Sequence, residues 1–97
     1  MGESIAFSLF VTGRTARSQQ AVRSMKQLCS DLQTDIDFEI IDVLEQPEAA
    51  ERARVLATPT LIKHSPGEER RVIGDLEDLK QVRRWLNLPD SYNTDGG

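Results

Sequence analysis

The stretch that decides the fold is Leu56-Ala57-Thr58-Pro59-Thr60-Leu61, in which a proline separates an alanine-rich segment from a β-branched one. The residue before a proline is pushed out of helical backbone geometry, so Thr58 is predicted to end the preceding helix. A strand is then predicted to begin at Thr60. Most X–Pro bonds are trans, although a tight turn can select the cis form. The sequence therefore predicts a helix-to-strand turn and leaves the Thr58–Pro59 isomer open.

A strand, a helix and a second strand are predicted before this turn. Apolar residues alternate from Ile5 to Val11, which indicates a strand that ends at Gly13. Ser18 suits a helix N-cap, and apolar residues then recur at helical spacing up to Leu32. The run at residues 38–43 is short and rich in β-branched residues, as in a strand. Two strands joined this closely by a helix favour a parallel crossover.

A short helix, a hairpin and a last helix are predicted around and after Pro59. Pro47 suits the first position of a helix that runs to Leu56. Residues 65–68 carry turn chemistry between strands at 60–63 and 71–73, and Gly74 closes the second of these strands. Asp75 suits the N-cap of the final helix. The apolar stripe of that helix consists of Leu76, Leu79, Val82 and Leu86. Asn87 and Pro89 are predicted to end the helix.

The predicted fold class is a single-domain α/β mixed sheet with the order β-α-β-α-β-β-α, spanning residues 1–89. Residues 90–97 have little apolar surface to bury and are expected to form a flexible tail. Both the element order and the position of Pro59 resemble the thioredoxin-like arrangement. In that arrangement the proline turn lies near the start of the first helix.

Composition narrows the classes of function. The chain has 97 residues and a formal net charge of −4, which argues against a nucleic-acid-covering protein with a concentrated basic face. Its apolar stretches are too short to span a bilayer, and its start lacks the pattern of a secretory signal. Cys29 is the single cysteine, so no intramolecular disulfide can form. We therefore expect a cytoplasmic protein without membrane or nucleic-acid partners.

No pattern in the sequence indicates catalysis. A thioredoxin-type redox site needs a thiolate at a helix start, whereas residues 13–18 contain no sulfur. Cys29 falls on the apolar stripe of the first helix, where a packing role is expected. His64 has no neighbouring histidine or cysteine at metal-ligand spacing. The sequence predicts no enzyme activity, cofactor or metal; Thr15 and Ser18 are the only groups that could activate a substrate at the helix start.

Four segments carry a family resemblance. They are LFVTGRT at 9–15, IDVL at 41–44, LATPTL at 56–61 and RRVIGDL at 70–76, and together they are similar to the KaiB family of circadian clock proteins. The resemblance implies a non-enzymatic clock component that binds the N-terminal ATPase ring of KaiC. In that complex, family members sequester KaiA.

The resemblance also implies two alternative arrangements of the C-terminal half, one of them thioredoxin-like, that lie within a few kcal/mol of each other. The positions that bear on this choice are Pro59, Gly74, Asp75, Trp85 and Asn87. Trp85 and Asn87 stand where clock KaiB chains typically carry glycine and aspartate. Replacing a glycine inside a helix removes a penalty of about 1 kcal/mol. We therefore expect the thioredoxin-like arrangement, as a monomer or a weak homo-oligomer.

Partner contacts follow from the same resemblance. Arg54, Lys63 and Arg70 align with basic positions on the KaiC-facing surface of the family, although such charges can equally be solvated surface. Asp37 and Glu39 stand where the family presents small and basic residues toward KaiA, so KaiA binding is not expected. Two alternatives stay open. One is a stand-alone relative of the sensor domain of the histidine kinase SasA, and the other is a glutathione-dependent enzyme of thioredoxin fold.

Overall fold

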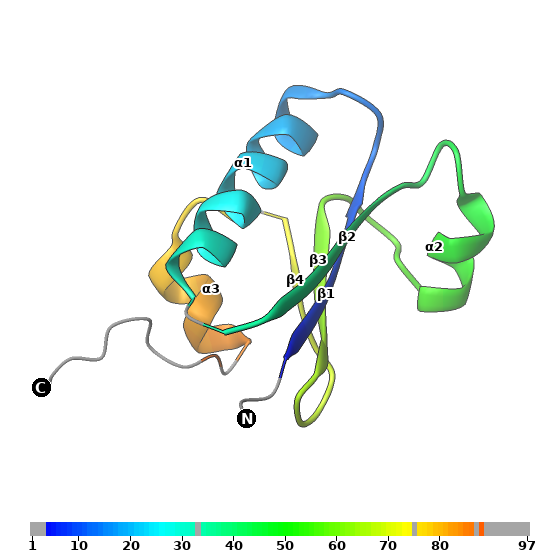
Figure 1. Ribbon diagram of the computed structural model, residues 1–97. Coiled ribbons are helices and arrows are strands. Elements are labelled where there is room, and N and C mark those ends of the chain that lie inside the picture. Colours follow the sequence, from blue (N-terminus) through cyan, green and yellow to red (C-terminus); the bar gives the residue numbers. More distant parts are fainter. Residues whose placement is uncertain (1–3, 33, 75, 87, 89–97) are drawn as a thin grey trace, which may run out of the picture.

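Four strands form one mixed sheet in the order β2-β1-β3-β4 (Figure 1). The computed structural model describes residues 4–32, 34–74, 76–86 and 88. Strand β1 pairs in parallel with β2 and antiparallel with β3, which pairs antiparallel with β4. The elements are β1 (Ile5–Val11), α1 (Ala16–Asp31), β2 (Ile36–Asp42), α2 (Pro47–Ala53), β3 (Thr60–Ser65), β4 (Arg70–Ile73) and α3 (Leu79–Trp85). This order confirms the predicted thioredoxin-like fold.

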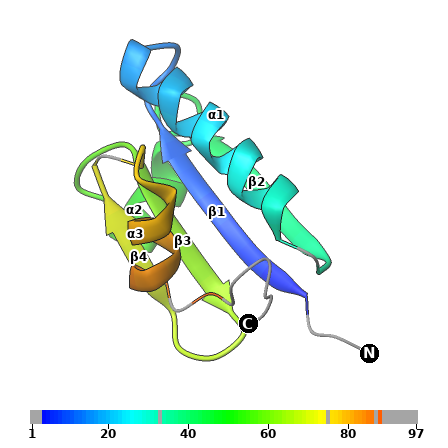
Figure 2. The same ribbon diagram turned by 90° about the vertical axis from the view of Figure 1, so that its left-hand side faces the viewer.

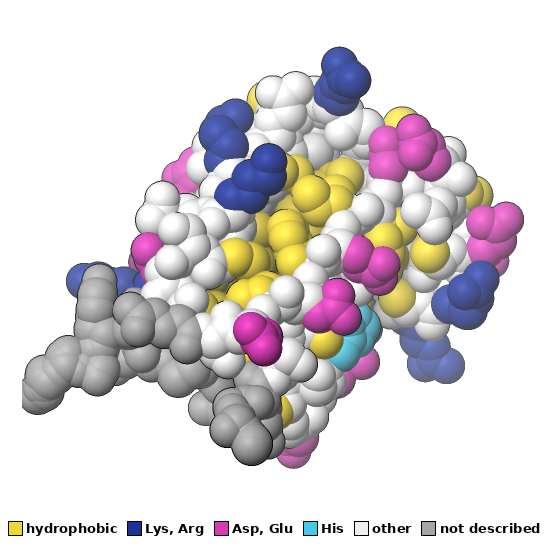
Figure 3. Space-filling view, viewed as in Figure 1, with side chains coloured by type: hydrophobic (Ala, Val, Ile, Leu, Met, Phe, Trp, Pro, Cys, Tyr) yellow, Lys and Arg dark blue, Asp and Glu magenta, His cyan; other side chains and the backbone are white. Residues whose placement is uncertain are grey.

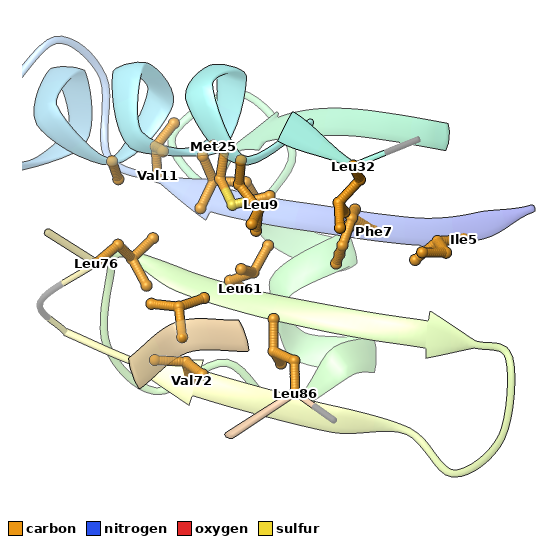
Figure 4. Close-up of a cluster of buried hydrophobic side chains, with 13 residues drawn as sticks. Ile5, Phe7, Leu9, Val11, Met25, Leu32, Leu61, Val72, Leu76 and Leu86 are labelled. Atoms are coloured by element: carbon orange, nitrogen blue, oxygen red, sulfur yellow. The ribbon is translucent and has the colours of Figure 1, made fainter. Parts of the chain in front are cut away.

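The helices cover the two faces of the sheet unequally. Helices α1 and α3 lie on one face and α2 lies on the other (Figures 1 and 2). Alternate residues of β1 point toward α1 and α3, where they meet Met25, Leu61 and Leu86 (Figure 4). On the α2 side, a smaller apolar cluster contains Phe10, Ile41 and Ile62. Because β1 is buried on both faces, it is the central element of the core.

Two helices begin at positions that differ from the predicted ones. Helix α1 begins at Ala16, and Thr15 is its N-cap, because the Thr15 hydroxyl accepts the backbone N–H of Ser18. The prediction of Ser18 as N-cap is therefore wrong. Helix α3 begins at Leu79 and is capped by Asp78, whose carboxylate accepts the backbone N–H of Gln81. The predicted cap Asp75 lies outside the described residues.

Helix α2 ends earlier than predicted. Its last residue is Ala53, and Arg54 takes a left-handed conformation with a φ of 58°. The Arg54 N–H donates to the Glu51 carbonyl, and the Val55 N–H donates to the Ala50 carbonyl, so the last carbonyls of the helix are satisfied within this turn. The helix therefore ends at Ala53, and Pro59 does not determine where it ends. Leu56, predicted to be helical, lies in the following loop.

An ion pair joins the two helices on the α1 side of the sheet. An Arg83 Nη2 of α3 lies 3.2 Å from an Asp31 carboxylate oxygen at the end of α1. Both side chains are mostly shielded from water, which strengthens their attraction relative to a fully exposed pair. The pair fixes where α3 lies along α1. None of the described helices is both long and apolar enough to cross a membrane.

Leu86 is expected to contribute far more to stability than its neighbour Trp85. Leu86 is fully buried, whereas Trp85 is half exposed. Leu86→Ala should lower the free energy of unfolding by about 2–5 kcal/mol because it leaves a cavity under α3. Trp85→Ala should lower it by roughly 1 kcal/mol. Urea unfolding of both variants measures the difference, and equal losses would contradict this packing of α3.

Preference for this arrangement in solution stays a prediction, and backbone NMR shifts test it. Residues 79–85 should show helical shifts, since no glycine interrupts α3. Trp85→Gly restores a helix penalty of about 1 kcal/mol and should weaken those shifts. Strand shifts at residues 82–86 in the unmodified chain would refute the preference. Asn87, the other residue assigned to it, lies outside the described residues.

Candidate functional site

The turn before β3 brings three chain segments to one end of the sheet. The Thr58–Pro59 bond is cis. The Thr58 hydroxyl lies 2.5 Å from the Thr12 hydroxyl at the end of β1. The Pro59 carbonyl accepts the backbone N–H of Gly74 at 2.9 Å, just after β4. Gly74 has a φ of 98°, which a side chain would strain. The end of β1, the proline turn and the end of β4 are thus bonded together.

The start of α1 lies beside this turn and offers no free nucleophile. Ser18 is buried, and its Oγ accepts the Thr12 backbone N–H at 3.0 Å and the Thr15 hydroxyl at 2.9 Å. The Ser18 hydroxyl is within 3.3 Å of the Thr12 carbonyl, to which it donates. Ser18 therefore closes the turn between β1 and α1. The activating group that a glutathione-dependent enzyme would need is not supplied by this hydroxyl.

Two hollows flank the proline turn. The smaller, about 310 Å³, lies between the start of α1 and Pro59, Gly74 and Leu76. The larger, about 550 Å³, is mostly apolar and is called the α2 hollow here. Its lining consists of Val43, Pro47, Ala50, Glu51, Arg54, Val55, Leu56, Ala57 and Thr58. Leu56 is 95% exposed and belongs to the apolar lining of this hollow.

A third hollow runs between α1 and β2. It measures about 540 Å³, and Val11, Val22 and Ile40 are its apolar residues. Figure 3 shows an apolar patch in the middle of this face, with basic side chains on the α1 side and acidic ones on the opposite side. Asp37 and Glu39 are exposed on β2, an edge strand of the sheet. The expectation that KaiA does not bind rests on the acidic side chains of these two residues.

The three basic residues predicted to contact a partner do not gather in one place. Arg54 is exposed at the rim of the α2 hollow. Arg70 is exposed at the start of β4, 3.6 Å from Glu68. Lys63 pairs across from Arg70 but is only 3% exposed, and its Nζ donates to the Pro66 carbonyl at 2.9 Å. The prediction of Lys63 as a surface contact therefore does not fit its position in the fold.

Arg71 is a positioning residue that the sequence analysis missed. One of its guanidinium nitrogens, Nη2, donates to the Ala53 carbonyl at 3.0 Å, and Nη1 donates to the Arg54 carbonyl at 3.4 Å. These bonds fasten the end of α2 to β4. They hold Arg54 at the rim of the α2 hollow. Arg71 lies 18 residues after Ala53 in a predicted strand, so no local sequence signal marks this role.

Cys29 has the predicted packing role. It lies on α1 and packs against the main core, partly buried. Burial raises the pKa of the Cys29 thiol, which keeps it protonated and unreactive near neutral pH. Among the described residues, no group of three or more histidine, cysteine, aspartate or glutamate side chains could hold a metal ion.

Comparison with known proteins identifies the family. The family model described as the KaiB domain matches residues 8–88. The chain belongs to the KaiB family. It is 42% identical to the circadian clock protein KaiB3 of Synechocystis over 85 residues, which covers 87% of this chain and 83% of that protein. It is 36% identical to the clock oscillator protein KaiB of Trichodesmium erythraeum, with 94% of each chain covered.

Solved structures give the same fold. The N-terminal domain of SasA from Synechococcus elongatus superposes with a TM-score of 0.72 at 30% identity, over 90% of this chain and 87% of that one. Mitochondrial thioredoxin 3 of Saccharomyces cerevisiae superposes with a TM-score of 0.68 at 21% identity, over 82% of this chain and 76% of that one. The second similarity shows the fold alone. KaiB clock proteins are non-enzymatic regulators, in agreement with the predicted lack of catalysis.

Ser18→Ala tests the structural role of this hydroxyl. Removing it leaves the partly buried N–H of Thr12 without its acceptor, which should lower the free energy of unfolding by about 1–3 kcal/mol. Ser30→Ala is the matched control, because Ser30 is exposed on the same helix. Thermal or urea unfolding measures both variants. Glutathione-dependent turnover that disappears in Ser18→Ala would instead establish an enzyme.

Proposed function

We propose that this KaiB-family chain is a non-enzymatic, clock-type binding module that engages the N-terminal ring of a KaiC-like ATPase. The single observation that carries the proposal is the fully exposed Leu56 over the apolar α2 hollow, with Arg54 at its rim. Family membership makes a clock partner the first one to test.

The α2 hollow has the composition of a protein-binding site. Protein interfaces concentrate their energy in a few apolar and arginine side chains that become desolvated on binding. Leu56 can enter a pocket on a partner, and the hollow can receive an apolar side chain in return. Arg54 adds a fixed cation that selects an acidic partner surface. Because Arg71 bonds the carbonyls of Ala53 and Arg54, the backbone that carries the Arg54 side chain is positioned before binding.

The remaining basic residues fit this proposal unequally. Arg70 lies at the opposite end of β4 from the proline turn, so it would contact only a partner that spans the sheet edge. Lys63 is left out because its ammonium is buried and bonded. The acidic edge at Asp37 and Glu39 leads us to propose that KaiA is not a partner.

A second candidate function rests on the similarity to the SasA N-terminal domain. In this case the chain acts as a stand-alone sensor module in signalling. Both candidates are protein-binding functions. A histidine kinase that co-elutes with the chain, with no KaiC-type ATPase bound, would favour this second candidate.

A mixing experiment tests the leading proposal. The chain is mixed with the KaiC-type ATPases of its host at physiological salt, and the complexes are separated by size exclusion. Arg54→Glu should weaken the complex about tenfold or more, and Leu56→Ser should weaken it similarly, since each changes a side chain that lines the α2 hollow.

Arg52→Glu is the matched control. Arg52 is exposed in the last turn of α2, close to Arg54 in the sequence. The substitution makes the same change of charge, but Arg52 does not line the α2 hollow. Arg52→Glu should bind within about threefold of the unmodified chain, in the range of exposed charges outside an interface centre. Equal weakening by both charge reversals would contradict the proposed surface. Failure of the unmodified chain to bind any of these ATPases would contradict the proposed partner.

A further inference from the structure

A second polar cluster runs from the middle of β1 and β2 to the turn between β3 and β4 (Figure 1). The sequence analysis found His64 isolated, but Nε2 of His64 lies 2.8 Å from the Ser8 hydroxyl of β1. The Ser8 hydroxyl is in turn 3.3 Å from a Glu39 carboxylate oxygen of β2. On the other side, Nδ1 of His64 lies 3.9 Å from a carboxylate oxygen of Glu69, in the turn before β4. We call these four residues the His64 relay.

The relay fixes which nitrogen of the imidazole carries a proton. A carboxylate can only accept, so the Ser8 hydroxyl donates its hydrogen to Glu39. The Ser8 oxygen must then accept from Nε2 of His64, which therefore carries a hydrogen. In the neutral ring, Nδ1 keeps a lone pair that faces the Glu69 carboxylate. Protonation of Nδ1 replaces this unfavourable contact with the attraction of an ion pair between two half-exposed side chains.

The other charged groups around the ring leave this contact intact. Arg71 of β4 holds the second Glu69 oxygen at 3.1 Å, which keeps the carboxylate in place. The ammonium of Lys63, adjacent to His64 on β3, donates a hydrogen bond to the Pro66 carbonyl. Ser8 is only 4% exposed and its hydrogen is committed to Glu39, so the serine and histidine pair is not a nucleophile and its base.

We propose that the His64 relay is a proton-operated clasp that fastens the β3–β4 turn to β1 and β2. Histidine is the side chain whose charge ordinarily changes between about pH 5 and 8. In the neutral ring, His64 binds Ser8 alone. Once protonated, it still donates to Ser8 and also carries a positive charge 3.9 Å from the Glu69 carboxylate, so acid tightens the turn at residues 66–69. This device is connected to the α2 hollow through Arg71, because the same Nη2 donates to the Glu69 carboxylate and to the Ala53 carbonyl at the end of α2.

NMR on the full chain tests the proposal directly. His64 is the single histidine, so its ring signals are unambiguous. The ring should be the Nε2–H tautomer at pH 7.5. Hydrogen-exchange protection of Lys63 and Arg70, the last pair of the β3–β4 ladder, should rise about two- to fivefold from pH 7.5 to 5.5 after correction for intrinsic exchange.

Two adjacent carboxylates provide the matched variants. Glu69→Gln should abolish the rise in protection, because it removes the charge that faces Nδ1. Glu68→Gln should retain it, because Glu68 contacts Arg70 instead. Ser8→Ala should abolish the preference for the Nε2–H tautomer without changing either carboxylate. An Nδ1–H tautomer at pH 7.5 would overturn the proposal, as would an equal rise in protection in Glu69→Gln and the unmodified chain.

Discussion

The hydrogen bond from the Gly74 N–H to the Pro59 carbonyl is the constraint on which the rest of the structure depends. It continues the β3–β4 pairing past the end of the strands and holds the proline turn beside the start of α1. Because Thr58 also contacts Thr12, the same turn is tied to the central strand. The two hollows lie beside a turn that these bonds join to the ends of β1 and β4. A binding surface made of loops is thereby given the rigidity of the sheet.

The order of elements could be predicted because each element carries its own periodicity. The alternation of Ile5, Phe7, Leu9 and Val11, and the helical spacing after them, are strong local signals. Helix ends were harder to predict. Thr15 and Ser18 are both good capping residues, and only the packing of Ser18 into the turn decides between them. Likewise, nothing local in the sequence marks Arg54 as the left-handed residue, a position that glycine usually takes.

The candidate site was less predictable, since its contacts join distant parts of the chain. The resemblance carried by LATPTL and RRVIGDL indicated the family, and the match to the KaiB domain confirmed it. However, Ser8 and His64 are 56 residues apart, and their contact follows only from the pairing of β1 with β3. The burial of Lys63 has the same origin, because its register in the sheet turns a charged side chain toward the core. The pairing register of these strands is not evident from the sequence alone.

The left-handed backbone at Arg54 has a consequence for how this protein can evolve. A non-glycine residue in this conformation costs about 1–2 kcal/mol, so a glycine or asparagine at position 54 would stabilise the fold. Either stabilising substitution would therefore also remove the cation at the rim of the α2 hollow. Under the proposed function, an arginine is kept at this position because its contribution to binding offsets the loss of stability. A KaiB-family chain that does not use this surface has no such reason to keep an arginine there.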